Sequence, residues 1–336
     1  MGLTDFKPEY RIIANNADIT AVMRDRFKSL NLTDATGLEA DTLEIALADT
    51  DPLKPLRKPP KGAELRVEIG YNGQLHKMGL FVVDEVGISG LPGVMTIRAR
   101  AAPFEKSTGG ALHFQTQKTR AWKRNTTINA MVSKIATEHG LKSSVSKSLS
   151  STQLPEFHQT AESDMSFLVR VGQRYDAMVK IAGGKLSFLK RGEQLRADGS
   201  PMPTVTINKS DALDYDFLEA SRDDVGTVVA FWHSNAHAKR KQVSVGSGDP
   251  VKQLRQHYGT EAAAKAAAQA ELDKLKRGTS SFSCSVSGNA LLSAESSALL
   301  KGFHPDIPTT WLITQVTHRL SPGGYSCDVR CTLPND

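Results

Sequence analysis

The sequence of 336 residues lacks the patterns that mark several large classes of protein. No run approaches the ~18 consecutive apolar residues of a membrane-spanning helix, so we predict no membrane-spanning segment. Residues 1–8 do not combine a basic start with an apolar run, so we predict no secretory signal. Hydrophobic residues make up 39% and charged residues 23%, as in globular proteins. The length suits about two domains of ~150 residues.

The sequence also has little excess charge of one sign. It contains 42 Lys and Arg against 36 Asp and Glu, a net charge of +6. A nucleic-acid-binding protein usually gathers its basic residues in one stripe, so we predict no specific nucleic-acid binding. We expect the two densest basic clusters to lie in solvated hairpins or loops. The alternative is that they contact an anion. They are residues 239–241 and the looser group Lys118, Arg120, Lys123 and Arg124.

Cysteine is scarce, and the three cysteines have no metal-binding spacing. Cys327 and Cys331 are four residues apart in a segment that alternates like a strand. They would share one face but lie ~13 Å apart at ~3.3 Å per residue, too far for a disulfide. We predict that both, together with Cys284, are buried reduced thiols.

Catalytic signatures are absent as well. The sequence has no G-x-S-x-G elbow, no phosphate-binding G-x-x-x-x-G-K-[ST] loop and no H-E-x-x-H pair. His233 and His237 come nearest to a metal pair, but a strand would separate them by ~13 Å. A turn at Asn235 would bring them closer, still without an evident third ligand. We therefore predict no catalytic, cofactor-binding or metal-binding residues and a protein that is not an enzyme.

Two further groups of titratable residues are assigned to helix ends. Glu138 and His139 end a predicted helix, where the helix dipole favours histidine. Glu162 and Asp164 could imitate the paired carboxylates of a glycosidase. They lie at a predicted helix start, however, where acidic residues are expected as caps. We expect structural roles for all of them.

Hydrophobic periodicity predicts a mainly β chain with an α+β insert. In the first hundred residues, strands are expected at 64–70, 78–88 and 94–101, with a tight turn at Asn72–Gly73 and a proline-rich loop at 51–61. The middle block is expected to contain a helix with Ile128, Met131, Val132 and Ile135 on one face, a second helix starting at Ser163–Asp164, and a hairpin at 177–189. The last third is expected to contain strands at 212–220, 226–233 and 241–246 and an alanine-rich helix at 260–277.

An internal repeat relates the two ends of the chain. Residues 81–86 align with 311–316 at a shift of 230, and without a gap Pro92 then falls on Pro322 and Arg100 on Arg330. We predict two copies of one β-domain, residues 1–103 and 201–336, around a middle domain of residues 104–200.

Because strand side chains alternate between the two faces of a sheet, a constant shift predicts that aligned residues point to equivalent faces in both copies. Phe81, Val83 and Glu85 should share one face, as should Trp311, Ile313 and Gln315. Both aligned prolines are expected in the loops that follow, and Trp311 is expected in the core of the second copy.

Three segments together resemble the tail hub family of contractile phages, also called phage late control D protein. Residues 162–168 look like the family's E-S-D-x-x-F-L stretch, followed by Tyr-Asp-Ala at 175–177. Residues 183–188 look like the next hairpin, and residues 311–318 look like its W-x-I-x-x-V-x-H strand. Relatives include the hub of R-type pyocins and the hub portion of type VI secretion spike proteins.

The resemblance implies two tube-protein-like β-barrel domains around the α+β domain. It implies a homotrimeric baseplate hub that adapts a hexameric tail tube to a trimeric spike and contacts other baseplate proteins. The hub would lie in the tail baseplate of a phage or phage-like particle assembled in the bacterial cytoplasm. Because the chain ends at Asp336, soon after the second β-domain, we expect the spike to be a separate protein. The helix at 260–277 is insertion-like.

Residues 125–141 also resemble the first helix of a peptidoglycan-binding LysM module. The alternative function is therefore a tail component that binds or cleaves peptidoglycan.

Overall fold

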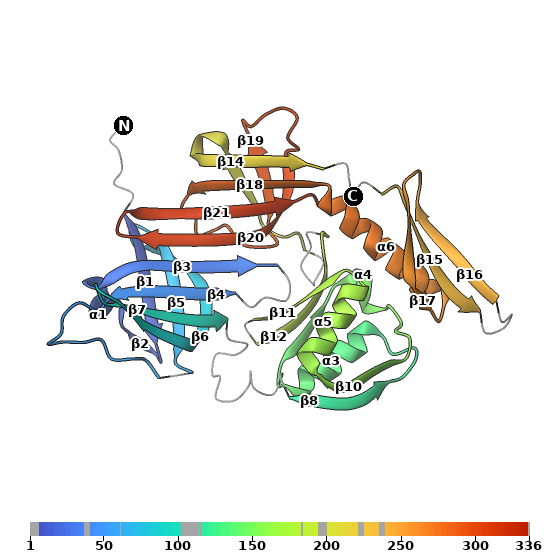
Figure 1. The fold of residues 1–336 in the computed structure, drawn as a ribbon, viewed down its shortest axis with the longest axis horizontal. Coiled ribbons are helices and arrows are strands. Elements are labelled where there is room, and N and C mark those ends of the chain that lie inside the picture. Colours follow the sequence, from blue (N-terminus) through green and yellow to red (C-terminus); the bar gives the residue numbers. More distant parts are fainter. Residues whose placement is uncertain are drawn as a thin grey trace.

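The computed structural model describes residues 7–36, 41–60, 62–101, 114, 116–182, 184–193, 200–220, 225–234 and 239–334. Within these residues the fold is mainly β, as predicted. One 13-stranded sheet dominates, and sheets of two, three and three strands accompany it (Figure 1). Residues 51–60 contain no helix or strand, as the prolines predict.

The large sheet contains two groups of six strands. The first β-unit consists of β1 (Pro8–Ala14), β3 (Phe27–Ala35), β4 (Thr42–Ala48), β5 (Glu64–Tyr71), β6 (Gln74–Ser89) and β7 (Val94–Ala101). The second β-unit consists of β13 (Thr204–Asn208), β14 (Ala212–Glu219), β18 (Ser280–Ser287), β19 (Ser297–Lys301), β20 (Thr310–Ser321) and β21 (Gly324–Thr332). Short elements accompany them: β2 (Ala17–Asp18), α1 (Thr20–Arg24) and the 3-10 turn η1 (Lys209–Asp211).

The two β-units have the same strand order. The first runs β3-β4-β7-β6-β5-β1 across the sheet and the second runs β14-β18-β21-β20-β19-β13, so strands of equal rank in the chain occupy equal places. The outermost pairs differ, since β1 is antiparallel to β5 whereas β13 is parallel to β19. Antiparallel pairing of β20 with β3 joins both units (Figure 1). One hydrophobic core runs through both units, and it contains the fully buried Phe81 and the predicted Trp311.

The predicted face pattern of the repeat fails after its first three residues because of a β-bulge. In β6 the extra residue is Asp84, between the pairs Val83–Ala99 and Glu85–Arg98. In β20 it is Thr314, at the equivalent place. A bulge turns the following side chains to the opposite face. Glu85 and Gln315 therefore do not share a face with Val83 and Ile313.

The gapless alignment is also wrong beyond the turns. Both hairpins have their proline in the turn, as predicted, but four residues separate Ser89 from Val94 and only two separate Ser321 from Gly324. The residue equivalent to Arg330 is consequently Arg98, since both follow the bulge in the ladder, and not Arg100.

The middle block forms its own hydrophobic core. Thr127 and Ser163 cap the two predicted helices, each accepting a hydrogen bond from the backbone N–H three residues later. The predicted hairpin is present, although Gly183 in its turn lies outside the described residues. The elements are β8 (Gln117–Trp122), α3 (Ile128–Glu138), β9 (Lys142–Val145), α4 (Lys147–Ser150), β10 (Phe157–Ser163), α5 (Asp164–Arg174), β11 (Ala177–Ala182) and β12 (Lys185–Lys190).

A third core lies between a small sheet and the alanine-rich helix. The sheet contains β15 (Thr227–Ser234), β16 (Lys239–Gly246) and β17 (Val251–Tyr258), and α6 (Glu261–Gly278) packs along it (Figure 1). Ala264 and Ala268 are fully buried against the sheet, as the small alanine side chains of this helix allow. All four elements lie between β14 and β18 in the chain.

Candidate functional site

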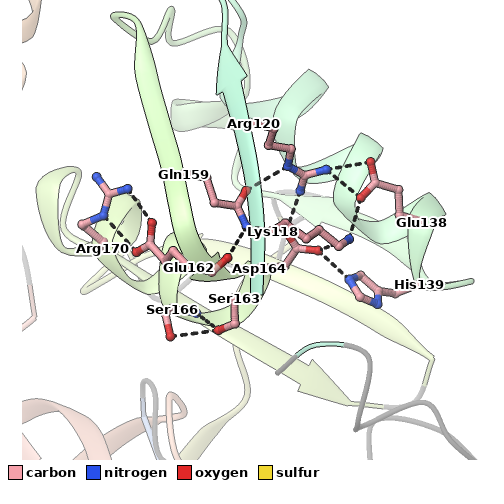
Figure 2. Close-up of polar contacts among 10 residues, drawn as sticks. All are labelled: Lys118, Arg120, Glu138, His139, Gln159, Glu162, Ser163, Asp164, Ser166 and Arg170. Atoms are coloured by element: carbon pink, nitrogen blue, oxygen red, sulfur yellow. Dashed lines mark hydrogen bonds and ion pairs between the residues drawn. The ribbon is translucent and has the colours of Figure 1, made fainter. Parts of the chain in front are cut away.

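Titratable residues that the sequence assigned to separate helix ends meet in one cluster. We call Lys118, Arg120, Glu138, His139, Gln159 and Asp164 the Asp164 cluster (Figure 2). Strand β8 supplies the two cations, the end of α3 supplies Glu138 and His139, and β10 supplies the glutamine. Asp164 is the first residue of α5. The cluster therefore fixes both helices against the two-stranded β8–β10 sheet.

Asp164 is the centre of this cluster, and its side chain is fully buried. One carboxylate oxygen accepts hydrogen bonds from Arg120 Nη2 at 2.6 Å and from Gln159 Nε2 at 2.9 Å. The other accepts from Lys118 Nζ at 2.6 Å and from His139 Nε2 at 2.8 Å. A carboxylate offers about four acceptor positions, so none is left for a ligand.

The surroundings of Asp164 favour its charged form. Burial by itself raises the pKa of this carboxyl, but hydrogen bonds from Lys118, Gln159 and His139 and the charge of Arg120 hold the pKa below its usual value. Glu138, which binds the same two cations, has its pKa lowered by the same balance. Two carboxylates thus neutralise two cations that are only partly exposed.

Two expectations from the sequence are wrong here. Glu162 and Asp164 do not cap α5, because the hydroxyl of Ser163 accepts the capping hydrogen bond from Ser166 N (Figure 2). Glu162 instead accepts two hydrogen bonds from Arg170. Lys118 and Arg120 are not solvated loop residues, since they lie in β8 and are bound by buried or half-buried carboxylates.

The contact between His139 and Asp164 has the geometry by which a carboxylate orients a histidine base. A base of this kind needs a nucleophile on its other ring nitrogen. Among the described residues, no hydroxyl or thiol is hydrogen-bonded to His139, and Phe114 stacks on its ring at 3.6 Å between centroids. The described residues also contain no group of three or more His, Cys, Asp or Glu able to hold a metal ion. The arrangement can position helices, and it offers no reacting atom.

A second charged cluster lies where the middle block meets both β-units. Lys180 of β11 contacts Asp34 of β3 at 3.0 Å and Asp41 at 3.3 Å. The other oxygen of Asp34 accepts a hydrogen bond from Ala294 N, in the second β-unit. The neighbouring Glu295 has a buried carboxyl oxygen without a hydrogen-bond partner. We call Asp34, Asp41, Lys180 and Glu295 the junction cluster.

The junction cluster holds three carboxyl groups around one lysine. Burial raises the pKa of Glu295 to about 7, and the charges of Asp34 and Asp41 add to that rise against the attraction of Lys180. Burial and the charge of Asp34 also raise the pKa of Asp41 to about 6. We therefore expect the charge of the junction cluster to change near neutral pH.

Other residues of the three family-like segments are also structural. Asp176, in the Tyr-Asp-Ala stretch, binds Arg277 of α6 through both carboxylate oxygens at 2.6 Å, and both side chains are buried. His318 is fully buried in β20, where its Nδ1 lies 2.8 Å from the Tyr325 hydroxyl. Burial lowers the pKa of His318 to about 4, so its ring is neutral in the folded chain.

The remaining predicted positions show no convergence. All three cysteines are free and buried, as predicted. His233 is exposed on β15 and His237 lies outside the described residues. Arg240, in the basic run 239–241, lies over the ring of Phe231 at 3.6 Å. Within the described ranges, no helix has both the length and the apolar character needed to cross a membrane.

Comparison with known proteins agrees with the family resemblance of the three segments described above. The chain is 36% identical to a probable baseplate hub protein of Escherichia phage P2 over 95% of this chain and 91% of that protein. It is 35% identical to a probable baseplate hub protein of Escherichia phage 186 over 96% and 92%. In fold it is similar to the 43 kDa tail protein of prophage MuSo2 from Shewanella oneidensis, with a TM-score of 0.71, 12% identity and coverage of 98% and 99%. Residues 109–324 match the family described as phage tail baseplate hub (GPD), and this chain belongs to that family.

Proposed function

We propose that this chain is the baseplate hub of a contractile tail and that it acts as a structural component, without catalysis. Two curated relatives more than a third identical over nearly the whole chain support the hub assignment. The Asp164 cluster supports the structural role, because the acceptor positions of the Asp164 carboxylate are occupied by hydrogen bonds that hold the helices in place. The place of action is the tail baseplate, assembled in the cytoplasm of the bacterial host.

The finer proposal is that the hub joins two assemblies of different symmetry. Three copies of the chain would present six β-units, matching a hexameric tail tube at one end and a trimeric spike at the other. The observation that carries this proposal is the repetition of one six-strand order within a single chain and a single sheet. Closed rings with cyclic symmetry are the usual form of such assemblies. Other baseplate proteins would contact the outside of the ring.

The division into domains is also a proposal. Separate cores support treating residues 104–200 as one domain. The two β-units share one core, so residues 1–103 and 201–336, although related, should unfold together rather than independently. The β15–β17 and α6 module has a core of its own inside the last range.

The experiment that tests the function is localisation and counting on assembled particles. A tagged full-length chain should be found at the baseplate end of purified tails, and its mass ratio to the tube protein should correspond to three copies per tail. A chain that is absent from tails would contradict the hub assignment. A chain present in six copies would contradict the adapter proposal only.

The peptidoglycan alternative gains no support from the structure. The apolar residues of α3 are used for packing in the middle core, and Glu138 and His139 at its end belong to the Asp164 cluster. A pull-down on purified sacculi tests it directly, and saturable binding by the full chain would revive it.

A further inference from the structure

The two β-units are joined where β20 pairs with β3, and we call this pairing the seam. Each of these two strands has an equivalent strand elsewhere in the chain. At the seam, residues 315–320 of β20 pair with residues 30–35 of β3, with His318 opposite Leu32 and Leu320 opposite Leu30. By strand order, β20 of the second unit corresponds to β6 of the first, and β3 of the first corresponds to β14 of the second. The chain therefore holds a second copy of each side of its own seam.

Both second copies are open edges. Among the described residues, residues 85–89 of β6 form a ladder only with β7, because the pairing of β6 with β5 ends at Val82. Strand β14 forms a ladder only with β18 in the part of the chain that the structure describes. Unpaired edges leave a row of N–H and C=O groups free and invite pairing with another strand.

Residues that are buried in the seam have equivalents that are exposed on the open edges. The bulges align β6 with β20 at a separation of 230, so Ile88 corresponds to His318. The bulges at Lys28 and Leu213 align β3 with β14 at a separation of 185. In the seam, His318 and Leu30 are both fully buried. On the open edges, Ile88 is 64% exposed, and Tyr215, equivalent to Leu30, is 39% exposed.

We propose that residues 85–89 of one copy pair antiparallel with β14 of the next copy, repeating between chains the seam that exists within the chain. Transfer of the seam register places Val86 opposite Glu219, Ile88 opposite Phe217 and Ser89 opposite Asp216. This inference rests on the proposed assembly of several copies and assigns its interface.

Side-chain chemistry along the transferred register is compatible with such a ladder. Ile88 and Phe217 lie on the face that continues the common core, where Phe217 already packs edge-on against Trp311. On the opposite face, Leu218, which is 59% exposed, comes opposite Gly87, which has no side chain to obstruct it. The two surfaces are different, so the contact is head-to-tail, and such a contact makes a ring when its rotation closes.

Cross-linking tests the register. In the full-length chain, Ser89→Cys combined with Asp216→Cys places two thiols directly opposite each other between copies. In the control, Ser89→Cys is combined with Leu218→Cys, on the same face but diagonal to Ser89, where the separation of ~7–8 Å is too large. The native cysteines are buried and their pKa values are raised by burial, so mild oxidation should spare them.

We expect intermolecular disulfides in the opposed pair, with linked species of two and three chains on a non-reducing gel, and little linkage in the control. Equal linkage of both pairs, or no linkage in a chain that light scattering shows to be trimeric, would overturn the seam and leave the hub proposal standing. Register-specific linkage that continues beyond three chains would support the seam and refute the trimer. A chain that stays monomeric and unlinked at high concentration would overturn the seam as well.

A second variant pair tests the same edge without cross-links. Ile88→Asp should abolish association, because it places a charge at the centre of the proposed ladder. Val22→Asp is the matched control, since Val22 is an exposed apolar residue of α1 outside both edges. Both side chains are more than half exposed, so both variants should keep the circular dichroism spectrum of the native chain. Unchanged association of the Ile88 variant would refute the proposal.

Discussion

Replacement of Asp164 by asparagine should destabilise the middle block strongly. The amide keeps one oxygen that can accept two of the four hydrogen bonds, and it turns an NH₂ group toward the other two donors. Two charge-assisted hydrogen bonds are lost, each worth ~1.5–3 kcal/mol. Lys118 retains Glu138 as a partner and is about one-third exposed, which reduces the loss. We therefore expect a decrease of about 3–5 kcal/mol in the free energy of unfolding, the range for breaking a buried ion pair.

Glu162→Gln is the matched control, two residues away. It also removes a carboxylate from an ion pair, but its partner Arg170 is nearly half exposed. Such pairs contribute about 0–1 kcal/mol. The two variants thus differ in the burial of the pair they disrupt and share their place at the start of α5.

Urea unfolding followed by tryptophan fluorescence can report on the middle block alone. Trp122 is buried there, stacked on Phe167, while Trp232 and Trp311 belong to the other two cores. A background with Trp232→Phe and Trp311→Phe leaves Trp122 as the reporter. Equal stability of the Asp164→Asn and Glu162→Gln variants would refute the reasoning.

The pH dependence of the Asp164 effect has a definite sign. A carboxyl whose pKa is lowered in the folded state stabilises above its unfolded pKa of ~3.9, and this contribution is lost as pH falls through the lower folded value. The difference between the native chain and Asp164→Asn should therefore be full at pH 7 and shrink in strong acid. A difference that is constant with pH would show that the variant acts through shape alone.

Three further variants test other parts of the argument. Glu295→Gln should have little effect at pH 5 and should stabilise by up to about 3 kcal/mol at pH 8, because a raised folded pKa of about 7 makes ionisation unfavourable in the folded state. Comparing urea midpoints of variant and native chain at each pH cancels the opposite contribution of His318, whose lowered pKa makes stability fall as pH drops below ~6.5. Trp311→Ala should cost ~3–5 kcal/mol in thermal or urea unfolding, and Trp311→Phe clearly less. Gly288→Ala should cost ~1–3 kcal/mol, since the added methyl group would overlap the ring of Tyr325, and unchanged stability would contradict that contact.

Local signals in the sequence predict local structure well. Helices α3 and α5 are recognisable because a capping hydroxyl coincides with a 3.6-residue apolar period, and Gly140 additionally marks the end of α3. The β5–β6 hairpin is recognisable because Asn72 and Gly73 both adopt the positive φ that its turn requires. Strand β18 is not evident from the sequence although Phe282, Cys284 and Val286 alternate and are buried, because serine at every other position resembles a loop.

The clusters of the candidate site could not be predicted in the same way. Lys118 and Asp164 are 46 residues apart, and only the packing of β8 against β10 and of α3 beside α5 brings their side chains together. A single acidic residue at a helix start has the same appearance in the sequence whether it caps the helix or is buried with two cations. The distinction depends on tertiary contacts, which periodicity does not encode. The Glu-Ser-Asp segment indicated the place but not the role.

The repeat was only partly visible in the sequence because the separation of equivalent residues changes along the chain. It is 185 between β3 and β14, where Asn31 corresponds to Asp216, and 239 between β4 and β18, where Glu44 corresponds to Ser283. The difference of 54 residues is accounted for by the module of β15–β17 and α6.

The ends of this module are adjacent, since Ala220 N donates to Thr279 O at 2.8 Å and so continues the β14–β18 ladder. Lengthening a connection between strands that are already paired costs little closure entropy, so the sheet tolerates the insertion. The separation then falls to 230 for β6 and β20 and becomes 232 after the turns. One fixed shift therefore detects a single strand pair, whereas strand order and two pairs of bulges identify the whole duplicated unit.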